Sequence, residues 1–311
     1  MFQLYQKRTF SSYMSDTIAF FRGYWKNFFG NYIVIAGGMI FVLCIFFFFI
    51  FRDMFSAMFS TENQGIGYDI GYYFSDNSGL FFALLAVAII LGLFLTIISM
   101  AYPIAYMQLM ENTGKDKFTA SEIFEQLKRY LPKLIKFALF SIGVMFPLIT
   151  LAVVISAVLI IIVIGIFLLL LLIPVSMALY SQMLFFYLHD DLGLFESLRT
   201  ALRMLFSKKN FWPIIGSTAA TYFIISIIES AISMIPYLVI MIGIVLSAND
   251  ETKGSNLTIL MAGLYIVSIA LSYIFYNVLM INQGLIFYSS KEQAEHTQAF
   301  SEIDLIGQNA E

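Results

Sequence analysis

The chain contains very little of the chemistry on which most enzyme and metal sites depend. Among its 311 residues there are one cysteine, Cys44, and two histidines, His189 and His296. A disulfide or a thiolate metal site within the chain is therefore excluded. The sequence also lacks a glycine-rich phosphate loop, paired histidines at helical spacing and a nucleophile elbow. We therefore expect a protein that is not an enzyme and has no cofactor and no metal.

Charged residues are scarce as well. They make up 12% of the chain and hydrophobic residues 60%, whereas soluble domains contain about 25% charged residues. The sequence contains no basic tract interleaved with exposed aromatic residues, so nothing in it indicates a nucleic-acid partner. The composition therefore predicts an all-α polytopic membrane protein. Six transmembrane helices are expected at 32–51, at 80–108, twice within 137–188 with a tight turn near Gly165, at 211–234 and at 257–288.

The positive charges are segregated along the chain. All lysines and arginines except Arg52 and Lys253 lie in the N-terminal arm, around 115–136 and 199–209, or near the C-terminus. The positive-inside rule therefore predicts cytoplasmic N- and C-termini. Pro236 is expected to end the fifth helix. For residues 237–247 three arrangements stay open: a re-entrant segment, an interfacial segment, or a continuation of the fifth helix.

An apolar stripe with helical spacing occurs three times, and each copy leads into a long apolar run. The stripe uses offsets 0, 1, 4, 7, 8, 11 and 12, which share one face of an α-helix. The copies are Tyr13, Met14, Phe20, Phe21, Tyr24 and Trp25, with Thr17 at offset 4; Ile123, Phe124, Leu127, Tyr130, Leu131, Leu134 and Ile135; and Leu194, Phe195, Leu198, Ala201, Leu202, Leu205 and Phe206. A partial fourth copy is Ala299, Phe300, Ile303 and Ile306.

This pattern predicts one membrane domain, residues 10–298, built from three pseudo-repeats. Each pseudo-repeat is an amphipathic interfacial helix followed by a transmembrane hairpin. The expected parts are a flexible cytoplasmic arm (1–9), three repeats (10–118, 119–190 and 191–298), and a cytoplasmic tail (299–311) with a partial amphipathic helix. In the second repeat, Ser121 and Glu122 are expected to begin the amphipathic helix, because a hydroxyl and a carboxylate favour the first turn.

Basic residues on the amphipathic segments are the first candidate site. They are Lys128, Arg129, Lys133, Arg199, Arg203, Lys208 and Lys209. One interpretation is that they bind anionic lipid headgroups or a partner in a membrane-protein complex. The other is that they only fix the topology of the chain in the membrane.

Polar residues inside the apolar runs are the second candidate site. Glu229 is the one ionisable side chain within an expected span, and such residues often mark a functional site. Ser226 and Ser233 share its helix, and Ser268 and Ser272 lie at a similar depth on the sixth. They form either a cation-binding or protonatable position in a transport path, or a serine-lined helix contact near the outer surface.

Two further polar groups have two interpretations each. His189, Asp190 and Asp191 form a weak metal-ligand cluster or the polar end of the fourth helix. The even-numbered helices end in tyrosine, glutamine and asparagine, for example Gln182 and Gln283. These residues line a polar vestibule or make interhelical hydrogen bonds within an interfacial belt.

Two short motifs, Trp25-Lys26-Asn27-Phe28 and Lys208-Lys209-Asn210-Phe211, join the basic amphipathic segments to the apolar runs. With six spans in three units, this arrangement resembles a group of uncharacterised bacterial six-helix membrane families. That group is distantly similar to the membrane domain of some glycerophosphodiester phosphodiesterases. The resemblance implies a non-catalytic module of the bacterial inner membrane.

Two functions follow from these expectations. The first is a non-enzymatic scaffold, anchor or inner-leaflet organiser. The alternative is a permease or exporter of a lipid-like or hydrophobic small molecule.

Overall fold

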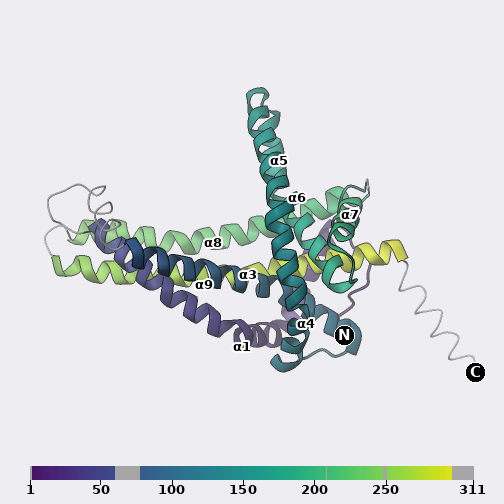
Figure 1. Cartoon of the computed structure of the whole chain (residues 1–311), viewed down its shortest axis with the longest axis horizontal. Coiled ribbons are helices and arrows are strands. Elements are labelled where there is room, and N and C mark those ends of the chain that lie inside the picture. Colours follow the sequence, from purple (N-terminus) through teal and green to yellow (C-terminus); the bar gives the residue numbers. More distant parts are fainter. Residues whose placement is uncertain (1, 60–77, 208, 248–250, 296–311) are drawn as a thin grey trace, which may run out of the picture. The chain divides into compact units, whose positions relative to one another are not determined.

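The computed structural model describes residues 2–59, 78–207, 209–247 and 251–295. The secondary structure of these residues is entirely helical. In chain order the elements are α1 (Phe10–Phe59), α3 (Ser78–Thr113), α4 (Ala120–Phe140), a π turn (Ser141–Met145), α5 (Phe146–Val158), a 3₁₀ turn (Leu159–Ile162), α6 (Ile164–His189), α7 (Leu194–Leu205), α8 (Phe211–Ser247) and α9 (Glu251–Glu295) (Figure 1).

Six helical stretches are long and apolar enough to cross a membrane. They are Phe10–Arg52, Phe81–Thr113, Ala120–Ile161, Ile164–His189, Phe211–Val239 and Ile259–Ala294. Large apolar side chains on these helices point outward, including Val34, which is 71% exposed, and Phe167, which is 69% exposed. An apolar surface of this extent is unfavourable in water but matches lipid. The expectation of an all-helical, multi-pass membrane protein is confirmed.

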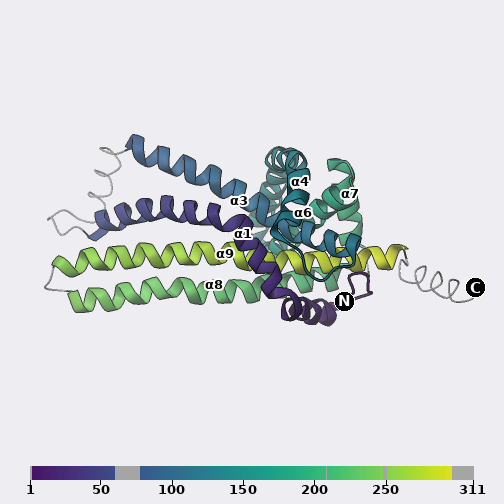
Figure 2. The ribbon, with the colours of Figure 1, turned by 90° about the horizontal axis from the view of Figure 1, so that it is seen from below.

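The described residues belong to two compact units. The first contains Met1–Tyr32, Ser99–Ile224 and Tyr276–Glu311, and the second contains Ile33–Ile98 and Ile225–Phe275. Helices α8 and α9 run alongside each other (Figure 2), with rings of Tyr237 and Tyr265 in contact within the second unit. In that unit Met261 and Ala262 are fully buried against Phe48, Phe51 and Tyr265.

Three helix boundaries differ from the predicted ones. Helix α1 continues without a break from its amphipathic first part into the first span, and α4 continues through Pro132. Pro236 does not end the fifth helix either, so residues 237–247 continue it as part of α8. A proline inside a helix removes one backbone hydrogen bond and bends the helix, but it need not end it. The predicted break is found in the third copy, where α7 ends at Leu205 and α8 begins at Phe211.

The tight turn expected near Gly165 is confirmed. Helix α5 ends at Val158 and α6 begins at Ile164, after Val163, which has a φ of 66°. A β-carbon at Gly165 would lie 2.1 Å from the carbonyl oxygen of Ser156. Only glycine allows the two helices of this hairpin to approach so closely.

Residues 2–9 are packed instead of forming the predicted mobile arm. The Arg8 side chain is 1% exposed and its Nε lies 2.8 Å from Asp16 Oδ2. Its other nitrogens donate to the carbonyl oxygens of Gln3 and Leu4, both at 2.6 Å. The backbone N–H of Arg8 donates to Ser289 Oγ on α9. Burying an arginine requires partners for its donors, and these contacts provide them. The 299–311 tail, with the partial fourth copy, lies outside the described residues, as does His296.

Each apolar stripe has one edge that is buried in the protein and one edge that is exposed. In α4, Ile123, Leu127, Tyr130 and Leu134 are buried against the rest of the first unit. In α7 the corresponding Ala201 and Leu205 are buried. The outer edge of α4 has Phe124 and Ile135 exposed, and the outer edge of α7 has Phe195, Leu202 and Phe206 exposed.

The N-cap of helix α4 lies two residues before the expected Ser121. This N-cap is Thr119, and Thr119 and Glu122 form a reciprocal capping box. The Thr119 hydroxyl accepts from the backbone N–H of Glu122, and the Glu122 carboxylate accepts from the backbone N–H of Thr119. The hydroxyl expected from Ser121 therefore comes from Thr119, while the expected role of Glu122 is confirmed.

Candidate functional site

A buried ion network joins α3, α6 and α9 within the first unit. His189 Nε2 lies 2.5 Å from Glu111 Oε2, and His189 Nδ1 lies 2.6 Å from Asp190 Oδ1. Lys291 Nζ donates to the same Asp190 oxygen at 2.8 Å. The His189 side chain is only 8% exposed. One of the two interpretations is that His189 and Asp190 form the polar end of the fourth helix. In the structure this polar end belongs to a network that also includes Glu111 and Lys291.

The contacts of His189 favour its charged form. When Glu111 and Asp190 are both ionised, they only accept hydrogen bonds, so both ring nitrogens donate, and an imidazole that donates twice carries a positive charge. The network of Glu111, Asp190, His189 and Lys291 is then electrically neutral. Burial alone would raise the pKa of Asp190, but the hydrogen bonds from His189 and Lys291 outweigh it and lower the pKa below its ordinary value.

Two tyrosines complete the coordination of Glu111. The hydroxyl of Tyr5 donates to Oε1 at 2.7 Å, and the hydroxyl of Tyr288 donates to Oε2 at 2.9 Å. The carboxylate thus accepts three hydrogen bonds from three separate parts of the chain. Among the described residues, no group of three or more His, Cys, Asp or Glu side chains is arranged to hold a metal ion.

The polar residues predicted at the ends of the even-numbered helices are buried in the first unit. Gln182 Nε2 donates to both the backbone oxygen and Oε1 of Gln283. Asn282 Nδ2 donates to Thr17 Oγ1 at 3.1 Å and to Ser217 Oγ at 3.0 Å. These bonds link α6 to α9, and α1 and α8 to α9. The geometry agrees with the interpretation that these residues make interhelical hydrogen bonds.

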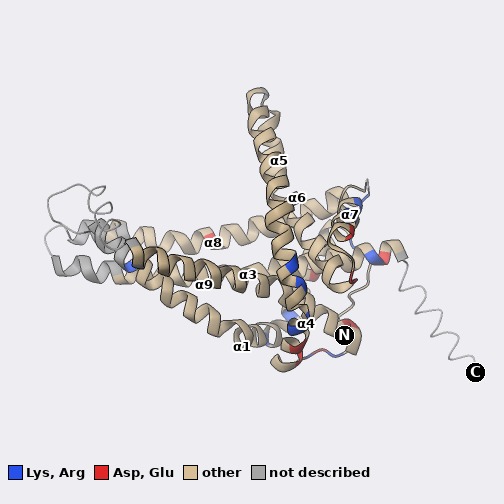
Figure 3. Cartoon of the chain, in the orientation of Figure 1, with Lys and Arg blue, Asp and Glu red and all other residues tan. Residues whose placement is uncertain are grey.

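Figure 3 marks the lysines and arginines of the described residues in blue. The predicted basic residues among them lie in three different environments. Lys128 and Arg129 on α4, and Arg199 on α7, are exposed. Lys133 pairs with Asp191 Oδ1 at 2.7 Å, so it joins α4 to the chain that follows α6.

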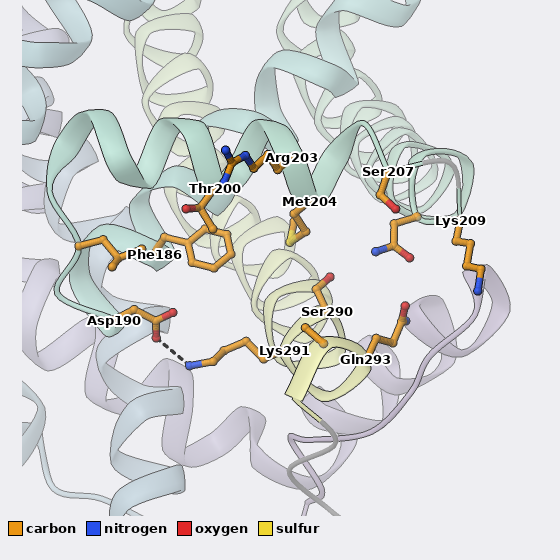
Figure 4. A pocket seen from close by; sticks show the side chains of 13 residues that line it. Phe186, Asp190, Thr200, Arg203, Met204, Ser207, Lys209, Ser290, Lys291 and Gln293 are labelled. Carbon is orange, nitrogen blue, oxygen red and sulfur yellow. Dashed lines mark hydrogen bonds and ion pairs between the residues drawn. The ribbon is translucent and has the colours of Figure 1, made fainter.

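The remaining cations border a pocket, except Lys208, which lies outside the described residues. The pocket has a volume of about 500 Å³ and lies between the end of α6, α7, the turn before α8 and the last part of α9. Arg203, Lys209 and Lys291 line it together with Asp190 and Ser290 (Figure 4). Three cations and one carboxylate therefore face this space. Composition alone did not reveal the pocket, because α7 and α9 are far apart in the sequence.

The predicted intramembrane group lies in the second unit, on α8 and α9. Glu229, Ser226 and Ser233 are partly buried on α8. On α9, Ser268 Oγ donates to the backbone oxygen of Leu264 and Ser272 Oγ to that of Ser268, both at 3.1 Å. These hydroxyl protons are therefore used within α9 and are not donated to Glu229.

No family model, no curated protein and no solved structure matches this chain. The resemblance to the membrane domain of glycerophosphodiester phosphodiesterases therefore stays a prediction. What is shown, for the residues that the structure describes, is entirely helical secondary structure with six helices long and apolar enough to span a membrane.

Proposed function

We propose that this protein is a non-enzymatic, multi-pass scaffold or anchor of the bacterial inner membrane, with both termini in the cytoplasm. In this role it holds partner proteins and organises anionic lipids of the inner leaflet. The observation that carries the proposal is the surface of α4, where exposed apolar and cationic residues lie side by side. Phe124 and Ile135 are 57% and 53% exposed, and Lys128 and Arg129 are exposed beside them. This is the pattern of a helix lying in the headgroup layer.

The three copies of the stripe support a repeated role. Offset 7 is buried in each copy, as Phe20, Tyr130 and Ala201. Offset 12 is exposed in each copy, as Trp25, Ile135 and Phe206. A repeated pattern of one inward and one outward edge is expected if each copy rests on the same leaflet in the same way.

Charge reversal on α4 tests this proposal. Lys128→Glu and Arg129→Glu are made separately in the full chain, and anionic lipids and proteins that co-purify with it from native membranes are quantified. A cation near an anionic leaflet contributes about 1 kcal/mol, and each reversal changes the charge by two units. Each reversal is therefore expected to weaken lipid association roughly thirtyfold. Lys133 is left unchanged, because reversing it would place a second carboxylate against Asp191.

Lys117→Glu is the matched control, because it makes the same charge change on an exposed loop residue just before α4. A similar loss in all three variants would show that net charge alone matters and would contradict a specific role of α4. Full retention of lipids and partners by Lys128→Glu and Arg129→Glu would refute the proposal.

The alternative, a permease for a lipid-like molecule, has one observation in its favour. Glu229 is an ionisable residue only partly buried in an otherwise apolar helix. Transport sites commonly combine several polar groups at broken helices, whereas α8 is continuous here. If Glu229→Gln abolished uptake or export of a hydrophobic compound in cells while the protein level stayed normal, the permease would replace the scaffold as the favoured function.

A further inference from the structure

The pocket beside α7 has a charge balance that calls for an anion. Its three cations, Arg203, Lys209 and Lys291, face one carboxylate, Asp190, so two positive charges are left over. Lys291 already pairs with Asp190. Among the described residues, neither Arg203 nor Lys209 has an ion-pair partner.

The carboxylate in the pocket does not repel an anion strongly. Asp190 accepts hydrogen bonds from both His189 and Lys291, so its charge is directed toward two cations. Its lowered pKa, which follows from these bonds despite burial, agrees with that pairing. The field that reaches the space is therefore set mainly by Arg203 and Lys209.

A buried hydroxyl without a partner points to the same space. Ser290 is 7% exposed, and its Oγ has no hydrogen-bond partner among the described residues. Figure 4 shows its side chain extending from α9 toward Met204 on α7. A buried hydroxyl left without a partner is unfavourable, so such groups usually have a role that the protein alone does not show.

We propose that this pocket binds a phosphate group carrying two negative charges, either as the monoester headgroup of a lipid or as a soluble phosphate. Two unpaired cations match a dianion in charge. Phosphate oxygens accept hydrogen bonds from guanidinium, ammonium and hydroxyl groups, and the pocket lining offers one of each in the exposed Arg203, the exposed Lys209 and the buried Ser290. The pocket volume of about 500 Å³ lies within the usual range of small-ligand sites. With a lipid as the source of the phosphate, this inference rests on the proposed role in organising anionic lipids and adds a second site to it, because none of the pocket residues belongs to α4.

The test uses the full chain in nanodiscs and three probes. Inorganic phosphate is titrated into nanodiscs of neutral phosphatidylcholine by calorimetry. In parallel, binding of phosphatidic acid, a monoester, and phosphatidylglycerol, a diester, is compared by native mass spectrometry of the protein released from mixed nanodiscs. Selective binding of phosphatidic acid identifies a lipid source for the phosphate, and binding of inorganic phosphate identifies a soluble source. Either outcome supports the site.

Variants locate the binding to the pocket. Arg203→Gln is expected to weaken binding about tenfold or more, since it removes a charge-assisted hydrogen bond. Ser290→Ala is expected to weaken it about threefold to tenfold. Arg199→Gln is the matched control, since Arg199 is an exposed arginine of the same helix that does not line the pocket; it should change affinity by less than about twofold.

Two results would overturn the site. One is the absence of binding by every probe, and the other is an equal loss of affinity in Arg199→Gln and Arg203→Gln, which would indicate diffuse attraction only. Unchanged elution volume and unfolding temperature show that each variant is folded. If Arg203→Gln fails this criterion, Lys209→Gln in the turn before α8 takes its place, with the same expected loss.

Discussion

Replacing His189 by leucine is the most direct test of the ion network. Leucine keeps much of the side-chain volume but removes the cation that lies between Glu111 and Asp190, at 2.5 and 2.6 Å. Both carboxylates then lose a charged donor in a site where His189 itself is only 8% exposed. Removing one partner of a buried ion pair costs about 3–5 kcal/mol. Asp190 keeps Lys291 and Glu111 keeps two tyrosines, so we expect a loss near the lower limit, about 3 kcal/mol.

The loss is measured as the change in unfolding temperature of the purified protein in detergent micelles. For a chain of 311 residues, about 3 kcal/mol corresponds to a decrease of roughly 4–6 °C. The double variant His189→Leu/Glu111→Gln is the internal control. The double variant also removes the negative charge of Glu111, which His189→Leu alone leaves without its cation. Its loss of unfolding free energy should therefore be smaller than the sum of the two single losses, by about 1–2 kcal/mol.

Two outcomes would refute this reasoning. One is a change in unfolding temperature of less than about 2 °C for His189→Leu, because the network would then contribute under about 1 kcal/mol. The other is strict additivity in the double variant, since groups in direct contact should show a coupling energy.

Three further predictions concern single sites. Gly165→Ala should destabilise the protein by at least about 2 kcal/mol, because the added β-carbon would overlap the α5 backbone. Gly143→Ala should not destabilise it, because no atom lies within 4 Å of the position of that β-carbon. Thermal unfolding of both variants checks this difference. Thr119→Ala should lower the free energy of unfolding by about 1 kcal/mol, because it removes the N-cap of α4. Ser121→Ala should lower it by less than about 0.5 kcal/mol. A larger loss for Ser121→Ala than for Thr119→Ala would contradict the observed cap. The pKa of Asp190 lies below its ordinary value of about 3.9. The stabilising charge of Asp190 is therefore fully present above about pH 3.9 and is lost as the pH falls through the lowered pKa. The difference in stability between wild type and Asp190→Asn should narrow between about pH 6 and about pH 3.

Features set by local composition were predictable from the sequence. The six spans follow from long uncharged runs, and the turn at Gly165 follows from an apolar run too long for one helix. Helix ends were less predictable. Pro236 is the expected end of the fifth helix, but it lies within the continuous helix α8, as Pro132 lies within α4. A proline weakens a helix by a fixed local amount, whereas neighbouring helices and lipid decide whether the helix continues.

The candidate site was only partly predictable, because its contacts are distant in the sequence. Lys128 and Arg129 lie on the exposed surface that the stripe indicated. The ion network was missed, since Glu111 and His189 are 78 positions apart and Asp190 and Lys291 are 101 positions apart. No periodic pattern links such pairs. The available signal was weaker: each of these charged residues lies near the end of an apolar span, where helices meet.

Polar groups in the first unit differ in whether they have hydrogen-bond or ion-pair partners within the protein, and this difference bears on function. Asn282 and Glu111 have several protein partners each, as expected where a polar group without a partner is costly. In the pocket this pairing is incomplete, since Ser290 Oγ has no partner and Arg203 has no ion pair among the described residues. Paired groups stabilise the helix packing by themselves. Arg203 is exposed to solvent, whereas the buried Ser290 Oγ gains a partner only when a molecule enters the lined space. This makes the pocket, and not the ion network beside it, the place to look for a bound molecule.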